Sequence, residues 1–156
     1  MREDSAIKMV VEWGGIRRGS VDELKIMANE TPEQLINRGF HRVASWSKVL
    51  VLHDPEKYLI YDARVAFATN LILYNSGSIE TFFPMPPSRN THIVRASNSQ
   101  IGIKLKLGKS KKIDGGDFYT SYLRMAKTVA EKMGCPAWQI EMALFARWPE
   151  LAKLAI

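Results

Sequence analysis

The sequence predicts a mainly α-helical fold in one domain over residues 1–156, with a long irregular middle segment in which a short β-strand is one option. Apolar residues recur at helical spacing in the first half of the chain and again from residue 118. Residues 75–117 are instead rich in Ser, Asn, Gly and Lys. With a mass of 17.7 kDa and 46% hydrophobic residues, the chain can bury a core without disulfide or metal support.

Three short helices are expected in the N-terminal quarter. Apolar spacing predicts a first helix over residues 7–13, which the glycine pair that follows would end. Ser20 and Glu23 form a capping-box pattern in front of a second helix. Pro32 fits the first position of a third helix, which is expected to stop near Gly39.

Two longer helices follow around a turn. Residues 40–52 predict a helix with a broad buried face, and residues 53–57 have turn chemistry. A short extended piece over 58–61 leads to Asp62, which we expect to cap a helix over 63–73, since its carboxylate can accept backbone N–H groups of the first turn.

The remaining chain is expected to be irregular and then helical. Residues 101–107 alternate with period two, which is typical of a short strand but equally of an irregular basic loop. The proline-rich stretch 84–90 predicts either a rigid loop at the mouth of a site or a simple connection. We expect a helix from Phe118 to Gly134 and a last helix from Trp138 to about Arg147.

Charge and cysteine content restrict the classes of function. The chain carries a net charge of +6 and has a pI near 9.5, which is compatible with a nucleic-acid partner without requiring one. Cys135 stands alone and the three histidines are scattered, so neither a disulfide nor a metal site is expected, and no cofactor is implied. No window approaches ~20 apolar residues. We therefore expect a cytoplasmic protein with no membrane contact, and nucleoid association in a prokaryote.

Lys48 and Asp62 are the residues with the strongest chemical potential. Lys48 lies among apolar neighbours, and burial of a lysine disfavours its ammonium form and makes the amine a nucleophile that can form a Schiff base. A nearby carboxylate such as Asp62 can stabilise developing positive charge or relay a proton. The simpler alternatives are a lysine whose amine reaches solvent and an aspartate that only caps its helix.

A lysine-bearing helix followed by a loop, an aspartate and another helix resembles the helix-hairpin-helix superfamily of DNA glycosylases. The similarity rests on Ser47-Lys48-Val49-Leu50 and Ile60-Tyr61-Asp62-Ala63-Arg64-Val65-Ala66. The whole stretch SWSKVLVLHDPEKYLIYDARVA is most similar to bacterial and archaeal proteins with an 8-oxoguanine DNA glycosylase fold. Similarity is strong over residues 38–73, and it is weaker at WGGIRR and at IEMALFA.

The resemblance implies base excision in DNA repair, a hydrolase and lyase activity on an oxidised or modified base of the 8-oxoguanine type. Lys48 would attack C1′ of a flipped nucleotide and displace the base, while Asp62 would stabilise the cationic sugar; the Schiff base would then permit strand cleavage. Phe145 is a candidate for stacking on the base, and Glu141, one helical turn earlier, for hydrogen bonding to its edge. Core packing of this pair is the alternative.

Two groups of residues are candidates for contact with the DNA backbone. One is the basic run Lys104, Lys106, Lys109, Lys111 and Lys112, which could follow phosphates or remain a solvated loop. The other is His41 and Arg42, at the position where the superfamily holds a phosphate. The glycines of the superfamily's hairpin are replaced by Ala44 and Trp46, which resist positive φ, so a different turn is expected.

The sequence is compatible with two other functions. The first is a non-catalytic DNA-binding module on a glycosylase scaffold, in phage defence or in regulation. The second is a helical protein-interaction domain. Because glycosylases usually carry more helices around their cleft, the chain is expected either to be a minimal version or to need a protein partner that completes the cleft.

Overall fold

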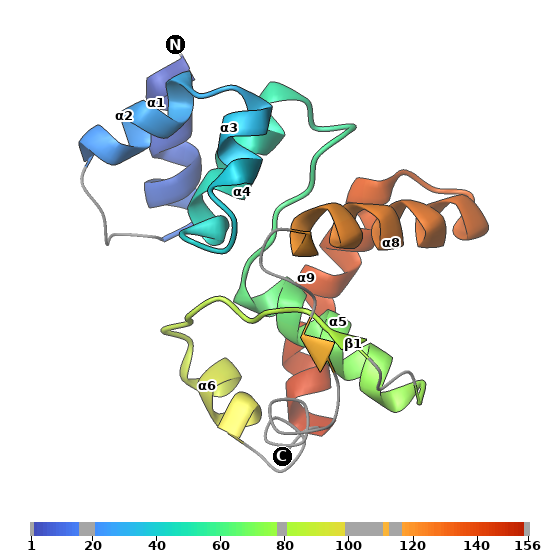
Figure 1. The fold of residues 1–156 in the computed structure, drawn as a ribbon. Helices are drawn as coiled ribbons and strands as arrows, with labels where there is room; N and C mark the ends of the chain where they lie inside the picture. Colours follow the sequence, from blue (N-terminus) through green and yellow to red (C-terminus); the bar gives the residue numbers. More distant parts are fainter. Residues whose placement is uncertain (1, 16–20, 78–80, 99–110, 113–116, 155–156) are drawn as a thin grey trace.

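The computed structural model describes residues 2–15, 21–77, 81–98, 111–112 and 117–154, and it confirms the mainly α-helical fold. Two groups of helices are joined by an extended segment, which runs between them in Figure 1. A single core cluster includes residues from both groups, so the two halves are packed together.

The first group holds the N-terminal helices. Its elements are α1 (Arg2–Ile7), the π-helix η1 (Lys8–Trp13), α2 (Val21–Asn29), α3 (Pro32–Asn37) and α4 (Val43–His53). The first expected helix is present, but it begins earlier, at Arg2, and its second half has π-helical geometry that ends at Gly14. The predicted cap Ser20 lies outside the described residues.

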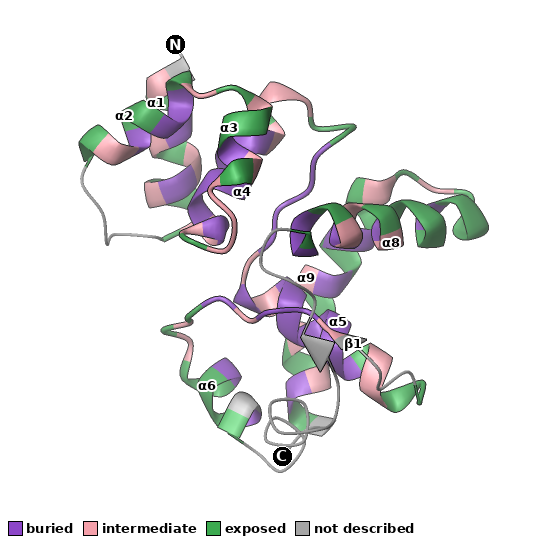
Figure 2. Cartoon of the chain, viewed as in Figure 1, coloured by how far each residue is buried: buried purple, intermediate pink, exposed green. Residues whose placement is uncertain are grey.

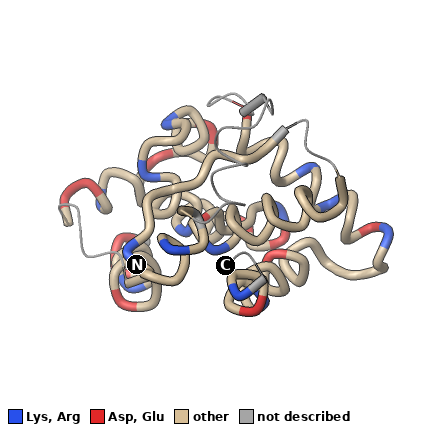
Figure 3. The backbone as a smooth tube through the Cα atoms, turned by 90° about the horizontal axis from the view of Figure 1, so that it is seen from below, with Lys and Arg blue, Asp and Glu red and all other residues tan. Residues whose placement is uncertain are grey.

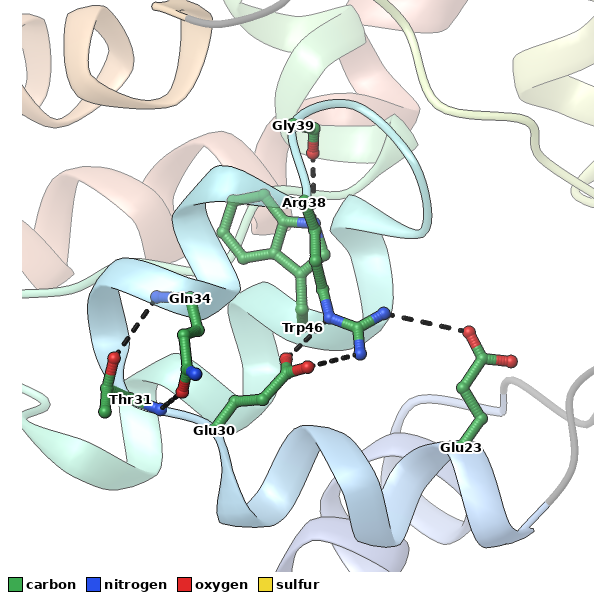
Figure 4. Close-up of polar contacts among 7 residues, drawn as sticks. All are labelled: Glu23, Glu30, Thr31, Gln34, Arg38, Gly39 and Trp46. Atoms are coloured by element: carbon green, nitrogen blue, oxygen red, sulfur yellow. Dashed lines mark hydrogen bonds and ion pairs between the residues drawn. The ribbon is translucent and has the colours of Figure 1, made fainter.

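The connection from α3 to α4 is fixed by side-chain contacts (Figure 4). Thr31 and Gln34 form a capping box at the start of α3. Arg38 makes two hydrogen bonds of 2.6 Å to Glu30, and the Trp46 indole N–H donates to the Gly39 carbonyl at 3.1 Å. These contacts hold the turn that separates the two helices.

The helix predicted over 40–52 begins only at Val43, so its expected start was wrong. Gly39 and Arg42 have φ of 60° and 54°, and left-handed residues interrupt an α-helix. Ala44 and Trp46 lie inside α4. The positive φ angles of this turn therefore fall before both of them, as the resistance of Ala and Trp to positive φ requires.

The second group holds the C-terminal helices. Its elements are α5 (Ala63–Asn75), α6 (Thr91–Asn98), α8 (Phe118–Met133), α9 (Ala137–Leu154) and two short parallel strands, β1 (Thr81–Phe82) and β2 (Lys111–Lys112). Gly134 ends α8 with φ 66°, as predicted. The strand considered for 101–107 lies outside the described residues.

The last helix is longer than the sequence predicts. It continues past Arg147 and through Pro149 to Leu154. Pro149 removes one helical hydrogen bond, which ordinarily favours a helix end. Here Trp148 before the proline and Leu151 and Ala152 after it pack against the core, and their burial stabilises the continued helix.

The extended segment between α4 and α5 is buried over its last residues (Figure 2). Side chains satisfy its backbone groups. The Tyr119 hydroxyl donates to the Leu59 carbonyl at 2.7 Å and accepts from the Leu59 N–H at 3.3 Å. Ser47 Oγ accepts from the Tyr61 N–H at 3.1 Å. This segment sets the position of Asp62 relative to α4.

Aromatic rings hold α8 against this segment and against α4. Trp46 meets Tyr119 edge-on with ring centroids 4.8 Å apart, and Tyr61 meets both Phe118 and Tyr122 at 5.1 Å. Edge-to-face pairs add to the stability gained from burial alone. The candidate residues on α4 and at the start of α5 therefore rest on a rigid base.

Candidate active site

Lys48 is buried on α4, with only 2% of its surface exposed. Its Nζ donates to the Ala44 carbonyl at 2.6 Å. Burial lowers the pKa of the amine below the ordinary 10.5, and the nearby Arg64 cation lowers it further, whereas Asp62 and Glu141 act in the opposite direction. An amine that donates one hydrogen to a carbonyl keeps its lone pair for attack once it is neutral.

Asp62 is the N-cap of α5, which confirms the predicted cap. Its Oδ1 accepts from the backbone N–H groups of Arg64 at 2.8 Å and Val65 at 3.1 Å. Its Oδ2 lies 3.9 Å from Arg64 Nη1. One carboxylate oxygen is thus committed to the helix, and the other lies beside a cation and within electrostatic reach of Lys48.

Glu141 comes from α9 and is 9% exposed. Its Oε2 accepts from the Ile60 N–H at 3.1 Å. Burial and the Asp62 charge raise the pKa of this carboxyl to about 7, while the Ile60 hydrogen bond and the Lys48 amine act to lower it. Such a group exchanges protons near neutral pH.

Phe145 lies one turn after Glu141 on α9 and is half-buried. Its ring stacks with that of Trp13, with centroids 6.1 Å apart and planes 20° from parallel. The Arg64 guanidinium lies over the Phe145 ring at 4.7 Å. Trp13 itself is 59% exposed. An aromatic pair beside a cation suits a flat, electron-rich ligand.

The structure therefore gathers Lys48, Asp62, Glu141 and Phe145 from three helices into one cluster. Sequence reasoning missed Trp13 and Arg64, which complete it. A signal for Arg64 existed, because it follows the capping aspartate by two residues in the first turn of α5. For Trp13, the only local signal was the glycine pair that follows it, which predicts a helix end and not a site. Its partner, Phe145, lies at the other end of the chain.

The proline-rich loop approaches the same region. The Tyr61 hydroxyl donates to the Pro84 carbonyl at 2.7 Å, and Arg89 Nη2 donates to the Gly15 carbonyl at 2.7 Å. These two bonds connect the loop to the extended segment and to the turn that follows Trp13. Residues 84–90 connect β1 to α6 with these two bonds, and their place at the mouth of a site stays a prediction.

The candidates for DNA-backbone contact are only partly placed. His41 is exposed, and Arg42 makes an ion pair of 2.8 Å with Glu23. Lys104, Lys106 and Lys109 lie outside the described residues, and Lys111 and Lys112 form β2. Over the other described residues, Lys and Arg are interspersed with Asp and Glu (Figure 3).

Comparison with family models, with curated proteins and with solved structures gives no match for this chain. Over the described residues, no three His, Cys, Asp or Glu side chains gather as metal ligands would. None of the described helices combines the length and apolar character needed to span a membrane.

Proposed function

We propose that the chain is a DNA glycosylase and lyase that removes an oxidised or otherwise modified base through Lys48. The observation that carries the proposal is a buried lysine amine within electrostatic reach of Asp62, Arg64 and Glu141, whose stem lies against Gly14, next to the stacked Trp13. Burying a charged lysine is costly unless it is paired or loses its proton, and buried groups with shifted pKa values cluster at functional sites. The resemblance of the 38–73 segment to 8-oxoguanine glycosylase-type proteins supports the same chemistry.

In this proposal a flipped nucleotide, extruded at a cost of roughly a few kcal/mol, presents C1′ to the Lys48 amine. The new N–C1′ bond replaces the glycosidic bond, whose electron pair leaves with the base, and the base takes up a proton. Asp62 stabilises the positive charge on the sugar. Opening of the sugar ring then gives a Schiff base, from which β-elimination can break the strand.

Glu141 and the aromatic pair have separate roles. A carboxyl with a pKa of about 7 can deliver a proton to the departing base and recover it at neutral pH. Trp13, which is 59% exposed and stacks on Phe145 behind it, offers a ring face for base stacking, which is worth about 1–3 kcal/mol per base. Arg64, beside both Asp62 and Phe145, supplies positive charge near the phosphates of a bound strand.

The test is borohydride trapping on duplexes that carry 8-oxoguanine, other modified bases or an abasic site. The proposal predicts a covalent protein–DNA adduct with the native chain and none with Lys48→Gln. The matched control is Lys57→Gln, which alters an exposed lysine in the turn after α4 and should form the adduct normally.

The same panel addresses the other readings. Salt-dependent DNA binding without an adduct on any substrate would contradict the enzyme and support a non-catalytic DNA-binding module. Absence of salt-dependent DNA affinity would contradict both and favour a protein-interaction domain.

A further inference from the structure

Gly14 ends η1 in a position where its lack of a side chain matters. A Cβ added there would lie 2.7 Å from Lys48 Cε and 3.1 Å from Lys48 Cδ, with the Val10 carbonyl oxygen also at 2.7 Å. Real Cβ atoms essentially never approach another heavy atom within 3.0 Å. The Gly14 backbone therefore lies directly on the aliphatic stem of the lysine.

Backbone conformation does not explain this glycine. Gly14 has φ −77° and ψ −12°, which any residue adopts. The neighbouring Gly15 is the opposite case, because its φ is +63° and an added Cβ would meet nothing within 4 Å. Of these two adjacent glycines, Gly15 answers a conformational need and Gly14 answers a need for space.

We propose that Gly14 is a positioning residue, which keeps open the space for the Lys48 stem and so places the lysine amine for attack. This inference rests on the proposed function of Lys48. It follows from the contact geometry that a methyl group at position 14 must displace the Lys48 stem, the Val10 carbonyl or both. Because the stem is buried, it has few alternative positions, and its displacement moves Nζ off the Ala44 carbonyl.

The position of Gly14 also links the lysine to the aromatic pair. Trp13, the preceding residue, stacks on Phe145. The end of η1 therefore contacts Lys48 through Gly14 and Phe145 through Trp13. A base that stacks on Trp13 therefore acts on the same turn that covers the lysine stem.

The first test is a double-mutant cycle in thermal stability, which is independent of catalysis. Gly14→Ala should lower the Tm of the native chain by several degrees and that of Lys48→Ala by less, because Lys48→Ala lacks both contacted carbons and only the contact with the Val10 carbonyl oxygen remains. Equal losses in the two backgrounds would overturn the proposal, as would failure of Gly14→Ala to fold in both. If Gly14→Ala folded only when Lys48 is replaced by Ala, this result would support the proposal most strongly.

The second test is the rate of borohydride trapping with saturating DNA. Gly14→Ala should slow adduct formation by about tenfold or more with little change in DNA Kd, since misplacing a reactive atom by ~1 Å is this costly. Gly15→Asn, which tolerates the left-handed conformation and whose Cβ would meet nothing within 4 Å, should stay within about twofold. An unchanged trapping rate in Gly14→Ala would overturn the positioning role. If the native chain forms no adduct, the proposed function fails, while the Tm cycle still decides whether Gly14 makes room for Lys48.

Discussion

The Glu141 carboxylate accepts a hydrogen bond of 3.1 Å from the backbone N–H of Ile60. This bond ties α9 to the extended segment that leads into Asp62, so a residue expected to contact a base also positions the candidate site. Only one carboxylate oxygen is used in this bond. The predicted hydrogen bond to a base edge would be made by the other oxygen, Oε1.

Glu141 should make stability pH-dependent between about 4.5 and 7. Its folded pKa of about 7 exceeds the ordinary 4.5, so the folded chain binds more protons in this window and the stabilisation present below pH 4.5 is lost as pH rises through 7. Glu141→Gln should remove up to about 3 kcal/mol of this dependence. Urea unfolding from pH 4 to pH 8 measures it.

The control for this measurement is Glu131→Gln, which alters an exposed carboxylate on α8 and should leave the pH profile as it is. If the stability difference between the native chain and Glu141→Gln were the same at every pH, the raised pKa of Glu141 would be contradicted.

Two substitutions of Asp62 should distinguish its role as a helix cap from its role in catalysis. Asparagine caps helices about as well as aspartate, so Asp62→Asn should keep the native Tm but lose most adduct formation, because the charge beside Lys48 is gone. Asp62→Ala should lose activity and also about 1 kcal/mol of stability. Thermal unfolding and trapping on the same samples make the comparison. Full adduct formation by Asp62→Asn would reduce Asp62 to a helix cap.

Trp13 should contribute to binding of damaged DNA rather than to folding, because it is mostly exposed. Trp13→Ala should weaken binding to a duplex with a modified base by roughly five- to 150-fold, the equivalent of losing about 1–3 kcal/mol of stacking. Fluorescence anisotropy at one fixed salt concentration measures the Kd. Trp138→Ala, at an exposed tryptophan near the start of α9, is the matched control; equal effects of the two changes would contradict the stacking role.

Tyr119 should be important for stability through one hydroxyl group. Tyr119→Phe leaves the buried N–H and carbonyl of Leu59 without their partner, at an expected cost of about 1–3 kcal/mol. Tyr74→Phe, at a half-buried position on α5, should cost less than about 0.5 kcal/mol. Chemical denaturation compares them, and similar losses would show that the hydroxyl does not hold the extended segment.

Local chemistry made part of this structure predictable. Pro32 at the start of a helix, Asp62 as a cap and Gly134 as a stop act within one helical turn, so the sequence pattern contains the whole interaction. The start of α4 was missed because it depends on left-handed Arg42, and the end of α9 because packing of Trp148 and Leu151 outweighs Pro149.

The candidate site could be predicted only in part for the same reason. Lys48 and Asp62 come from neighbouring helices, and an apolar run marks the lysine as buried. The pairing of Trp13 with Phe145 joins opposite ends of the chain, and nothing in the spacing of either residue signals the other. The contact of Gly14 with Lys48 is equally non-local.

The most direct measurement is the identity of the residue that carries the trapped DNA. After borohydride reduction, proteolysis and mass spectrometry, the account predicts that the adduct lies on Lys48. An adduct on another lysine or on the N-terminal amine, or no adduct with any modified or abasic duplex, would contradict it.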